Sequence, residues 1–239
     1  MISKSELKYI QSLCHKKQRQ EEGLFIAEGP KLVHELLNSN YTIHKLYALA
    51  GWLQTNKQVN IDIVEVNETE LEKISALQTP NSVLAVVQQK QATDPNIKGK
   101  ISLLLDGIQD PGNLGTIIRI ADWFGINEVL CSGDTTELYN PKVIQSTMGS
   151  FVRVNVWYGD IKNFLENTTV PVYGTLLQGR SIYETAKPKE ALLIIGNEGR
   201  GIKDELLPLI NYPITIPRMG GAESLNAAVA TGIVLSHLV

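Results

Sequence analysis

The chain has 239 residues, 43% hydrophobic and 20% charged, with a formal net charge of −3. Length and composition suit a globular protein of one large domain or two modest ones. The sequence has no uninterrupted apolar run of about 18 residues that could span a membrane. Its start is too polar for a secretory signal. Its two cysteines, Cys14 and Cys131, do not have the spacing of a metal site. We therefore expect a reduced, cytoplasmic protein with no metal site.

The net charge gives no overall basic footprint of the kind that nucleic-acid-binding proteins often carry. Basic residues nevertheless cluster near the start of the chain, with three glutamates among them. They are Lys4, Lys8, Lys16, Lys17 and Arg19. Two interpretations stay open, namely a solvated helix face and a local patch that contacts phosphates.

Apolar spacing predicts a small α/β unit over residues 5–87. Leu7, Ile10 and Leu13 fall at helical spacing, and Pro30 suits the first turn of a second helix. A third helix is expected from about Thr69, because Glu72 follows three residues later in a capping-box pattern. We expect strands at residues 25–29, 44–48, 61–66 and 82–87.

A polar segment at residues 88–100 separates this unit from the rest of the chain. Pro95 and Gly99 interrupt regular structure within it. We interpret the segment as an interdomain linker, the alternative being a surface loop inside one domain.

Beyond residue 100, apolar strand candidates alternate with helical segments. Their near-continuous apolar runs are typical of a parallel sheet covered on both faces, in which ligands bind outside the carboxyl ends of the strands. The expected strands are residues 101–105, 128–131, 152–157, 170–177, 191–195 and 212–216.

Three glycine-bearing loops follow such strands, and the first is Asp110–Arg119. Pro111 and Gly112 turn the chain, and Asn113 is expected to cap a helix over residues 114–124. Arg119 lies off the buried stripe of that helix, where it could hold a phosphate bidentately. The alternative is a helix cap followed by an ordinary exposed arginine.

The second loop, residues 196–201, has the order G-x-x-G-x-G and matches neither the dinucleotide nor the Walker pattern. Glu198 lies between its glycines, and burying a carboxylate there is costly without a partner. A ribose hydroxyl, an amine or an arginine is therefore implied beside it.

In the third loop, Gly220 and Gly221 are adaptable, Ser224 is expected to cap the last helix, and Asn226 to lie in its first turn. That helix is rich in small residues, which predicts a tight internal or subunit contact.

Together, these three loops closely resemble the three motifs of the SpoU (TrmH-like) RNA ribose 2′-O-methyltransferases of the SPOUT superfamily. The N-terminal part resembles that family's substrate-binding domain, a fold similar to ribosomal protein L30e. This weaker match rests on residues 16–19, 23–25, 28–29 and 79–86. The resemblance implies an RNA substrate-binding domain at residues 1–90, a linker at 91–100 and a catalytic domain at 101–239.

The resemblance further implies a parallel α/β sheet with a C-terminal trefoil knot, bound S-adenosylmethionine, an RNA partner and a homodimer without membrane contact. The catalytic residues it implies are Asn113, Arg119, Glu198, Ser224 and Asn226. The cofactor-binding residues are Thr175, Leu176, Gly196, Asn197, Gly199, Ile216, Leu225 and Asn226, and the RNA-binding ones are Lys16, Lys17 and Arg19. Ala227-Ala228 and Arg218 depart from the usual pattern, and Arg218 has no assigned role.

Arg119 matches the family's candidate for activating the ribose hydroxyl. Arginine keeps its proton in proteins, so we favour a phosphate clamp over a literal base. Asn113 and Arg119 are six residues apart, about 240° around an ideal helix. They can act together only if Asn113 lies in the turn before the helix.

Other functions stay open at this stage. They are methylation of a base, a catalytically silent RNA-binding protein, and nucleotide binding through the Gly196 loop. The N-terminal domain favours 23S ribosomal RNA over transfer RNA as the substrate, because it resembles the ribosomal RNA enzymes more than the compact transfer RNA ones.

Overall fold

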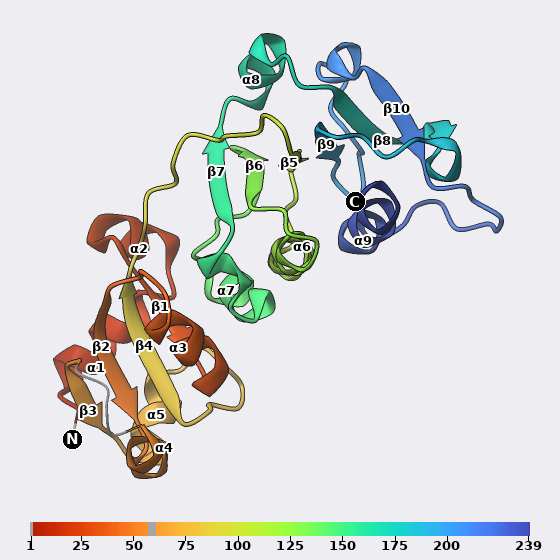
Figure 1. The fold of residues 1–239 in the computed structure, drawn as a ribbon. Coiled ribbons are helices and arrows are strands. Elements are labelled where there is room, and N and C mark those ends of the chain that lie inside the picture. Colours follow the sequence, from red (N-terminus) through yellow and green to blue (C-terminus); the bar gives the residue numbers. More distant parts are fainter. Residues whose placement is uncertain (1, 57–60) are drawn as a thin grey trace. The chain divides into compact units, whose positions relative to one another are not determined.

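The computed structural model describes residues 2–56 and 61–239, and their contacts form two units (Figure 1). The first unit comprises residues 1–91 and 139–152, and the second comprises residues 92–138 and 153–239. Residues 139–152 thus pack with the first unit, although they fall inside the range expected for the catalytic domain. The reason is apolar burial, because helix α7 (Pro141–Thr147) packs on strand β1 and the Phe151 ring lies 5.9 Å from that of Phe25.

The first unit has a four-stranded sheet in the order β1-β4-β2-β3, in which β4 is antiparallel to both neighbours. The four expected strands are confirmed to within two residues at every end. Its elements are α1 (Lys4–Ser12), α2 (Lys16–Glu22), β1 (Leu24–Glu28), α3 (Pro30–Leu37), β2 (Ile43–Ala48), α4 (Ala50–Thr55), β3 (Ile63–Glu65), α5 (Glu68–Ile74) and β4 (Val83–Gln88).

Helix α5 begins earlier than the sequence pattern indicated. Asn67 is its cap and accepts a hydrogen bond from the Glu70 backbone N–H at 2.9 Å, while the Glu70 carboxylate accepts one from the Asn67 N–H at 3.2 Å. The prediction of Thr69 and Glu72 was wrong because the same spacing occurs two residues earlier, where asparagine is an equally strong cap.

The second unit is a six-stranded sheet in the order β10-β8-β9-β5-β6-β7, and every neighbouring pair is parallel. The expected parallel α/β sheet is therefore confirmed. Its elements are β5 (Ile101–Leu105), α6 (Pro111–Trp123), β6 (Glu128–Ser132), β7 (Asn155–Gly159), α8 (Ile161–Asn167), β8 (Val172–Ser181), β9 (Ala191–Ile195), β10 (Tyr212–Thr215) and α9 (Ala227–Leu238), with short 3-10 turns at Ile182–Glu184 and Leu207–Leu209.

One strand lies later than expected. Residues 152–157 were predicted as a strand, but Ser150–Val152 forms a 3-10 turn of the first unit and β7 begins at Asn155. The small-residue helix α9 packs beside α6, and the two lie next to each other in Figure 1. A Cβ added to Gly232 of α9 would meet the Ile120 side chain at 3.7 Å, so α9 packs against α6 within the chain.

Among the helices of residues 2–56 and 61–239, none combines the length and apolar content needed to cross a bilayer.

Two glycines of the first unit give a matched test of backbone conformation. Gly23 ends α2 at φ +65°, whereas Gly51 lies inside α4, and an added Cβ would meet nothing within 4 Å at either position. Gly23→Ala should lower the free energy of unfolding by ~1–2 kcal/mol, because only backbone strain changes. Gly51→Ala should raise it by ~0.5–1 kcal/mol. Urea unfolding followed by circular dichroism measures both, and equal shifts of the two midpoints would contradict the strain argument.

Candidate active site

A pocket of about 760 Å³ lies at the carboxyl ends of β9 and β10, beside the middle of β8. This is the edge at which ligands bind in open parallel sheets, and the volume suits a ligand of cofactor size. Nine of the residues predicted for the site line this one pocket. They are Thr175, Leu176, Gly196, Asn197, Glu198, Gly199, Ile216, Ser224 and Leu225.

The loop after β9 is held in shape by Asn197. Its amide Nδ2 donates to the Gly107 carbonyl at 2.7 Å, and its Oδ1 accepts from the Gly199 N–H at 2.9 Å. Its backbone pairs with Gly201 in both directions, at 3.0 and 2.9 Å. A Cβ at Gly196 would lie 2.4 Å from the Gly201 carbonyl carbon, so close backbone approach requires that glycine.

Three motif residues form one directed chain of hydrogen bonds. The Asn226 Oδ1 accepts from the Ala228 and Val229 N–H groups at 3.0 and 3.2 Å, at the start of α9. Its Nδ2 donates to the Asn113 Oδ1 at 2.8 Å, and the Asn113 Nδ2 donates to a Glu198 carboxylate oxygen at 2.5 Å. All three glycine-bearing loops therefore meet at these side chains.

The direction of this chain follows from its two ends. The N–H groups at the start of α9 need an acceptor, so Asn226 must present its oxygen to them and its amino group to Asn113. Asn113 then presents its own amino group to Glu198, which suits a carboxylate acceptor. The partner of Glu198 is thus the Asn113 amide. The sequence had predicted a ribose hydroxyl, an amine or an arginine beside Glu198, and an amide was not among them.

The caps of the two site helices differ from those expected. Asp110 caps α6 by accepting from the Asn113 N–H at 2.9 Å, with Pro111 as the first helical residue. Asn226 caps α9, and Ser224 lies in the exposed loop before it. The predictions of Asn113 and Ser224 as caps were wrong, because in each case a neighbouring Asx residue takes that position.

Because Asn113 is the third residue of α6, it lies about 240° around the helix from Arg119. The condition set for the two to act together, Asn113 before the helix, is therefore not met. Asn113 faces the start of α9, whereas Arg119 is exposed and does not line the pocket. The structure brings together every predicted catalytic residue except Arg119.

A second polar cluster at the same edge of the sheet was missed from sequence. The Lys203 Nζ lies 3.1 Å from the fully buried carboxylate of Asp106 and 3.0 Å from that of Asp134. Arg200 and Ser132 also donate to Asp134, at 2.5 and 2.6 Å. The sequence pattern could have indicated this cluster, because Asp106 directly follows the apolar strand β5 and Ser132 is the last residue of the apolar strand β6.

This cluster holds Asp134 ionised. Burial alone would raise the pKa of Asp134, but hydrogen bonds from Ser132, Arg200 and Lys203 outweigh it and keep that pKa well below its usual range. Burial lowers the pKa of Lys203, and hydrogen bonds to Asp134 and Asp106 outweigh it and raise that pKa. Both shifts favour the charged pair, so the cluster joins the loops after β5, β6 and β9 electrostatically.

The basic residues of the first unit are not equivalent. Lys16 and Lys17 are exposed, and Lys17 pairs with Glu21 at 3.8 Å. Arg19 is only 2% exposed and donates to the Leu13 carbonyl at 2.9 Å, so it supports the helix turn and is not presented to RNA. The expected RNA contact by Arg19 is corrected accordingly.

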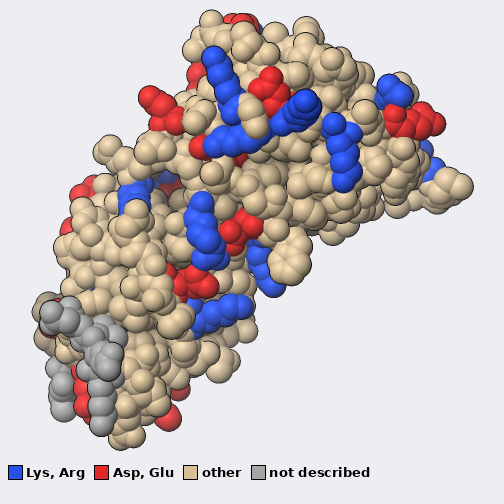
Figure 2. All heavy atoms as spheres, viewed as in Figure 1, with Lys and Arg blue, Asp and Glu red and all other residues tan. Residues whose placement is uncertain are grey.

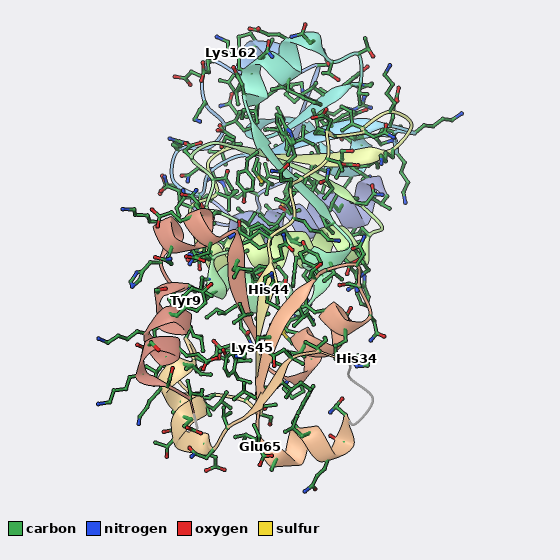
Figure 3. The ribbon with its side chains drawn as sticks, turned by 90° about the vertical axis from the view of Figure 1, so that its left-hand side faces the viewer. Tyr9, His34, His44, Lys45, Glu65 and Lys162 are labelled. Atoms are coloured by element: carbon green, nitrogen blue, oxygen red, sulfur yellow. The ribbon has the colours of Figure 1, made fainter. Side chains whose placement is uncertain are left out.

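One basic residue of this unit, Lys45, is paired within it. Lys45, labelled in Figure 3, and Tyr47 both donate to Glu6 at 2.7 Å, which ties α1 to β2. The hydrogen bond from Lys45 is the main cause that lowers the pKa of Glu6. On the face drawn in Figure 2, lysine and arginine stand among aspartate and glutamate without forming one continuous basic area.

The fold and the pocket define an α/β protein with a ligand site at the strand ends of a parallel sheet. The chain matches the SpoU rRNA Methylase family over residues 100–236 and an MRM3-like substrate binding domain over residues 4–85. It belongs to the SpoU rRNA methylase family, within the SPOUT superfamily.

Similar proteins match along almost the whole chain. The Bacillus subtilis 23S rRNA (guanosine(2553)-2′-O)-methyltransferase RlmP is 32% identical, over 98% of this chain and 95% of its own. A TrmH-family structure from Porphyromonas gingivalis is 38% identical with a TM-score of 0.90, covering 100% and 98% of the two chains. An AdoMet-bound rRNA methyltransferase from Sinorhizobium meliloti is 31% identical with a TM-score of 0.89, covering 100% and 96%.

A comparison of two aspartate caps in the second unit distinguishes an effect on stability from an effect on the geometry of the site. Asp110 caps α6 and Asp160 caps α8, each through one backbone N–H, at 2.9 and 3.0 Å. Changing either to alanine should cost ~1 kcal/mol of stability. Only Asp110→Ala should also lower the activity of the site, by about fivefold or more, because it loosens the turn that carries Asn113. Equal activity of the two variants at equal stability would refute this role.

The Asp134 cluster should make stability depend on pH in the acid range. Since its pKa is depressed on folding, its contribution is complete above the unfolded aspartate pKa of ~3.9 and is lost as pH falls below it. Asp134→Asn should therefore lower stability at pH 7 and flatten its decline below about pH 4. Exposed Asp94→Asn is the control, because it removes the same charge. Parallel acid-unfolding curves for wild type and Asp134→Asn would argue against the pairing.

Proposed function

We propose that this protein transfers a methyl group from S-adenosylmethionine to a ribose 2′-hydroxyl in RNA, with 23S ribosomal RNA as the substrate. The observation that carries the proposal is the chain of hydrogen bonds that joins Asn113 at the start of α6, Glu198 in the loop after β9 and Asn226 at the start of α9, with Glu198 lining the pocket. Family membership and the named activity of the RlmP relative, which matches both halves of the chain, support it.

The pocket has the chemistry that this cofactor needs. Leu176, Ile216 and Leu225 offer apolar surface for an adenine ring, and the glycine backbone of residues 196–201 allows close approach. Glu198 and Asn197 add polar groups to the lining, which suits a ribose and an amino group. We propose that these residues hold S-adenosylmethionine, as an AdoMet-bound relative of similar fold supports.

When bound, the cofactor supplies the methyl group from a sulfonium, a strong donor that needs no metal. The protein must then position the ribose and help its hydroxyl lose a proton. Asn113, Glu198 and Asn226 are proposed to fix the loops around the reacting groups. Their chain of hydrogen bonds fixes which atoms are left to face the substrate, because each amide group in it is already oriented.

Arg119 is proposed to bind a phosphate of the RNA. It cannot act as a literal base, because its guanidinium stays protonated in proteins. Arg119 lies on a different side of α6 from Asn113. It therefore contacts the RNA backbone next to the reacting ribose, and the two residues do not bind the same substrate atom. A guanidinium at that phosphate favours the ionised hydroxyl nearby, with the proton passing to phosphate or water.

Three further expectations belong to the same proposal. Lys16 and Lys17, both exposed, are proposed RNA contacts of the first unit. The expected trefoil knot and homodimer are carried over from the family resemblance. A ribosomal RNA substrate also favours work in the cytoplasm, where ribosomes are assembled.

The central experiment is methyl transfer from labelled S-adenosylmethionine into total RNA of a strain that lacks the gene, followed by mapping of 2′-O-methyl sites. Label in 23S RNA at one ribose is expected. Label in transfer RNA alone would overturn the substrate, and label in a base would overturn the reaction. Calorimetry with S-adenosylmethionine and with ATP separates an active enzyme from a silent RNA-binding or nucleotide-binding protein.

Replacing Arg119 by lysine tests the phosphate clamp. A lysine keeps the charge but loses the planar fork, so turnover should fall by about 10- to 100-fold, the equivalent of ~1.5–3 kcal/mol for a charge-assisted hydrogen bond. Binding of S-adenosylmethionine should not change, because Arg119 does not line the pocket. Exposed Arg180→Lys on β8 is the control. Near-normal turnover of Arg119→Lys would rule out bidentate clamping.

A further inference from the structure

Asp106 is a fully buried carboxylate at the carboxyl end of β5, where it directly follows Leu105. Burying a carboxylate is costly unless it is paired and hydrogen-bonded, so its partners indicate its role. One of its oxygens accepts a hydrogen bond from the Lys203 backbone N–H at 2.7 Å, and the other lies 3.1 Å from the Lys203 ammonium. Both oxygens of this carboxylate therefore face one residue.

Asp106 contacts both ends of the loop that follows β9. Its own backbone N–H donates to the carbonyl of Ile195, the last residue of β9, at 2.9 Å. Its side chain accepts from the N–H of Lys203, which directly follows the loop. All the residues between these two contacts, 196–202, line the pocket, whereas Asp106 and Lys203 do not. Asp106 thus closes the loop like a clamp, from the side that faces away from the pocket.

The residue after Asp106 carries further contacts of the same loop. The Gly107 carbonyl accepts from the Asn197 amide at 2.7 Å, and the Gly107 N–H donates to the Ser132 hydroxyl at 2.8 Å. Gly107 has a φ of +70°, and a Cβ there would lie 2.3 Å from a guanidinium nitrogen of Arg200. The turn after β5 therefore lies directly against the loop, and its orientation depends on how Asp106 is held.

A loop of this composition needs such support. Three of the residues 196–202 are glycines, which leave an unsupported backbone many conformations, and a ligand must then supply the free energy that orders it. We propose that Asp106 is a positioning residue for the cofactor, which clamps residues 196–202 in the shape that binds S-adenosylmethionine. This inference rests on the proposed function. The Lys203 ammonium balances the charge of the buried carboxylate.

Glu128 provides a matched control at the opposite edge of the same sheet. It is 8% exposed, it is the first residue of β6, and it lies 3.5 Å from the Lys100 ammonium. It also accepts from the Asn155 amide at 2.8 Å. Like Asp106, Glu128 is a buried carboxylate paired with a lysine, but it lies at the amino end of its strand and does not line the pocket. Glu128→Gln therefore removes a buried charge without loosening the loop.

The first measurement is the Kd for S-adenosylmethionine by calorimetry, with wild type, Asp106→Asn, Asp106→Ala and Glu128→Gln. Removal of the clamp in Asp106→Ala should raise the Kd by about 10- to 100-fold, as for the loss of a hydrogen bond to a charged group. Asp106→Asn should raise it less, because the amide oxygen still accepts the Lys203 N–H while the amide nitrogen faces the ammonium. Glu128→Gln should bind as wild type does.

Two further readouts distinguish positioning of the loop from support of the fold. At saturating S-adenosylmethionine, the kcat and the KM for RNA of Asp106→Asn should stay within about threefold of wild type, since bound cofactor holds the loop. Without cofactor, hydrogen exchange should become faster at the amides of residues 196–203 in both Asp106 variants, and should not change along β5 and β9.

Four results would overturn the inference. They are an unchanged Kd in Asp106→Ala, an equal rise in Glu128→Gln, a fall in kcat at saturating cofactor as large as the rise in Kd, and faster exchange across the whole sheet in Asp106→Asn. If Asp106→Ala does not fold, Asp106→Asn decides the question by the same measurements. The proposed function is judged separately, on whether wild type binds S-adenosylmethionine and methylates RNA. Loop exchange without cofactor tests the clamp whichever way that result falls.

Discussion

The chain of hydrogen bonds from the start of α9 through Asn226 and Asn113 to Glu198 is the interaction on which the site depends. It joins the start of α6, the loop after β9 and the start of α9, which are distant in sequence and follow strands β5, β9 and β10 of one parallel sheet. Asn226 and Asn113 each donate and accept through their amides, Glu198 only accepts, and the helix N–H groups fix the orientation of Asn226. A change at any one side chain therefore reorients the rest, which makes the network cooperative.

The sheet makes that meeting possible. Strands β5 and β9 are buried along nearly their whole length, so their ends are held by packing and not by the loops. The loops do not have to hold the strands in place, and their side chains make polar contacts. Two such sets share the same edge, the uncharged amides beside the pocket and the ion-paired cluster of Asp106, Asp134 and Lys203. The second set stiffens the loops from which the first one works.

Much of this arrangement could be predicted from sequence because apolar periodicity fixes strand identity. Ile101–Leu105 and Ala191–Ile195 agree with the structure at both ends. Helix starts were less predictable, since Asp110 and Asn113, or Ser224 and Asn226, are all residues that cap helices. Local preference cannot choose between neighbours of equal propensity, and the choice decides which side chain is left to face the site.

Other features were out of reach because they depend on long-range packing. The burial of Arg19 has no local signal, as its neighbours Lys16 and Lys17 are exposed lysines. The separation of Arg119 from Asn113 followed once α6 was seen to start at Pro111. The loop match to a known family indicated that both residues matter, but only the helix geometry showed that they work on different sides.

The place of α7 in the first unit has a consequence for how the chain is built. Because residues 139–152 pack with residues 1–91, the polypeptide passes between the two units three times, at 91–92, 138–139 and 152–153. A single cut in the polar segment after Gln91 would leave two covalent connections intact. A fragment starting at residue 101 would also carry Val143, Ile144 and Phe151 away from the surface that buries them. The residues that match the family model therefore include a segment, residues 139–152, whose contacts lie in the first unit.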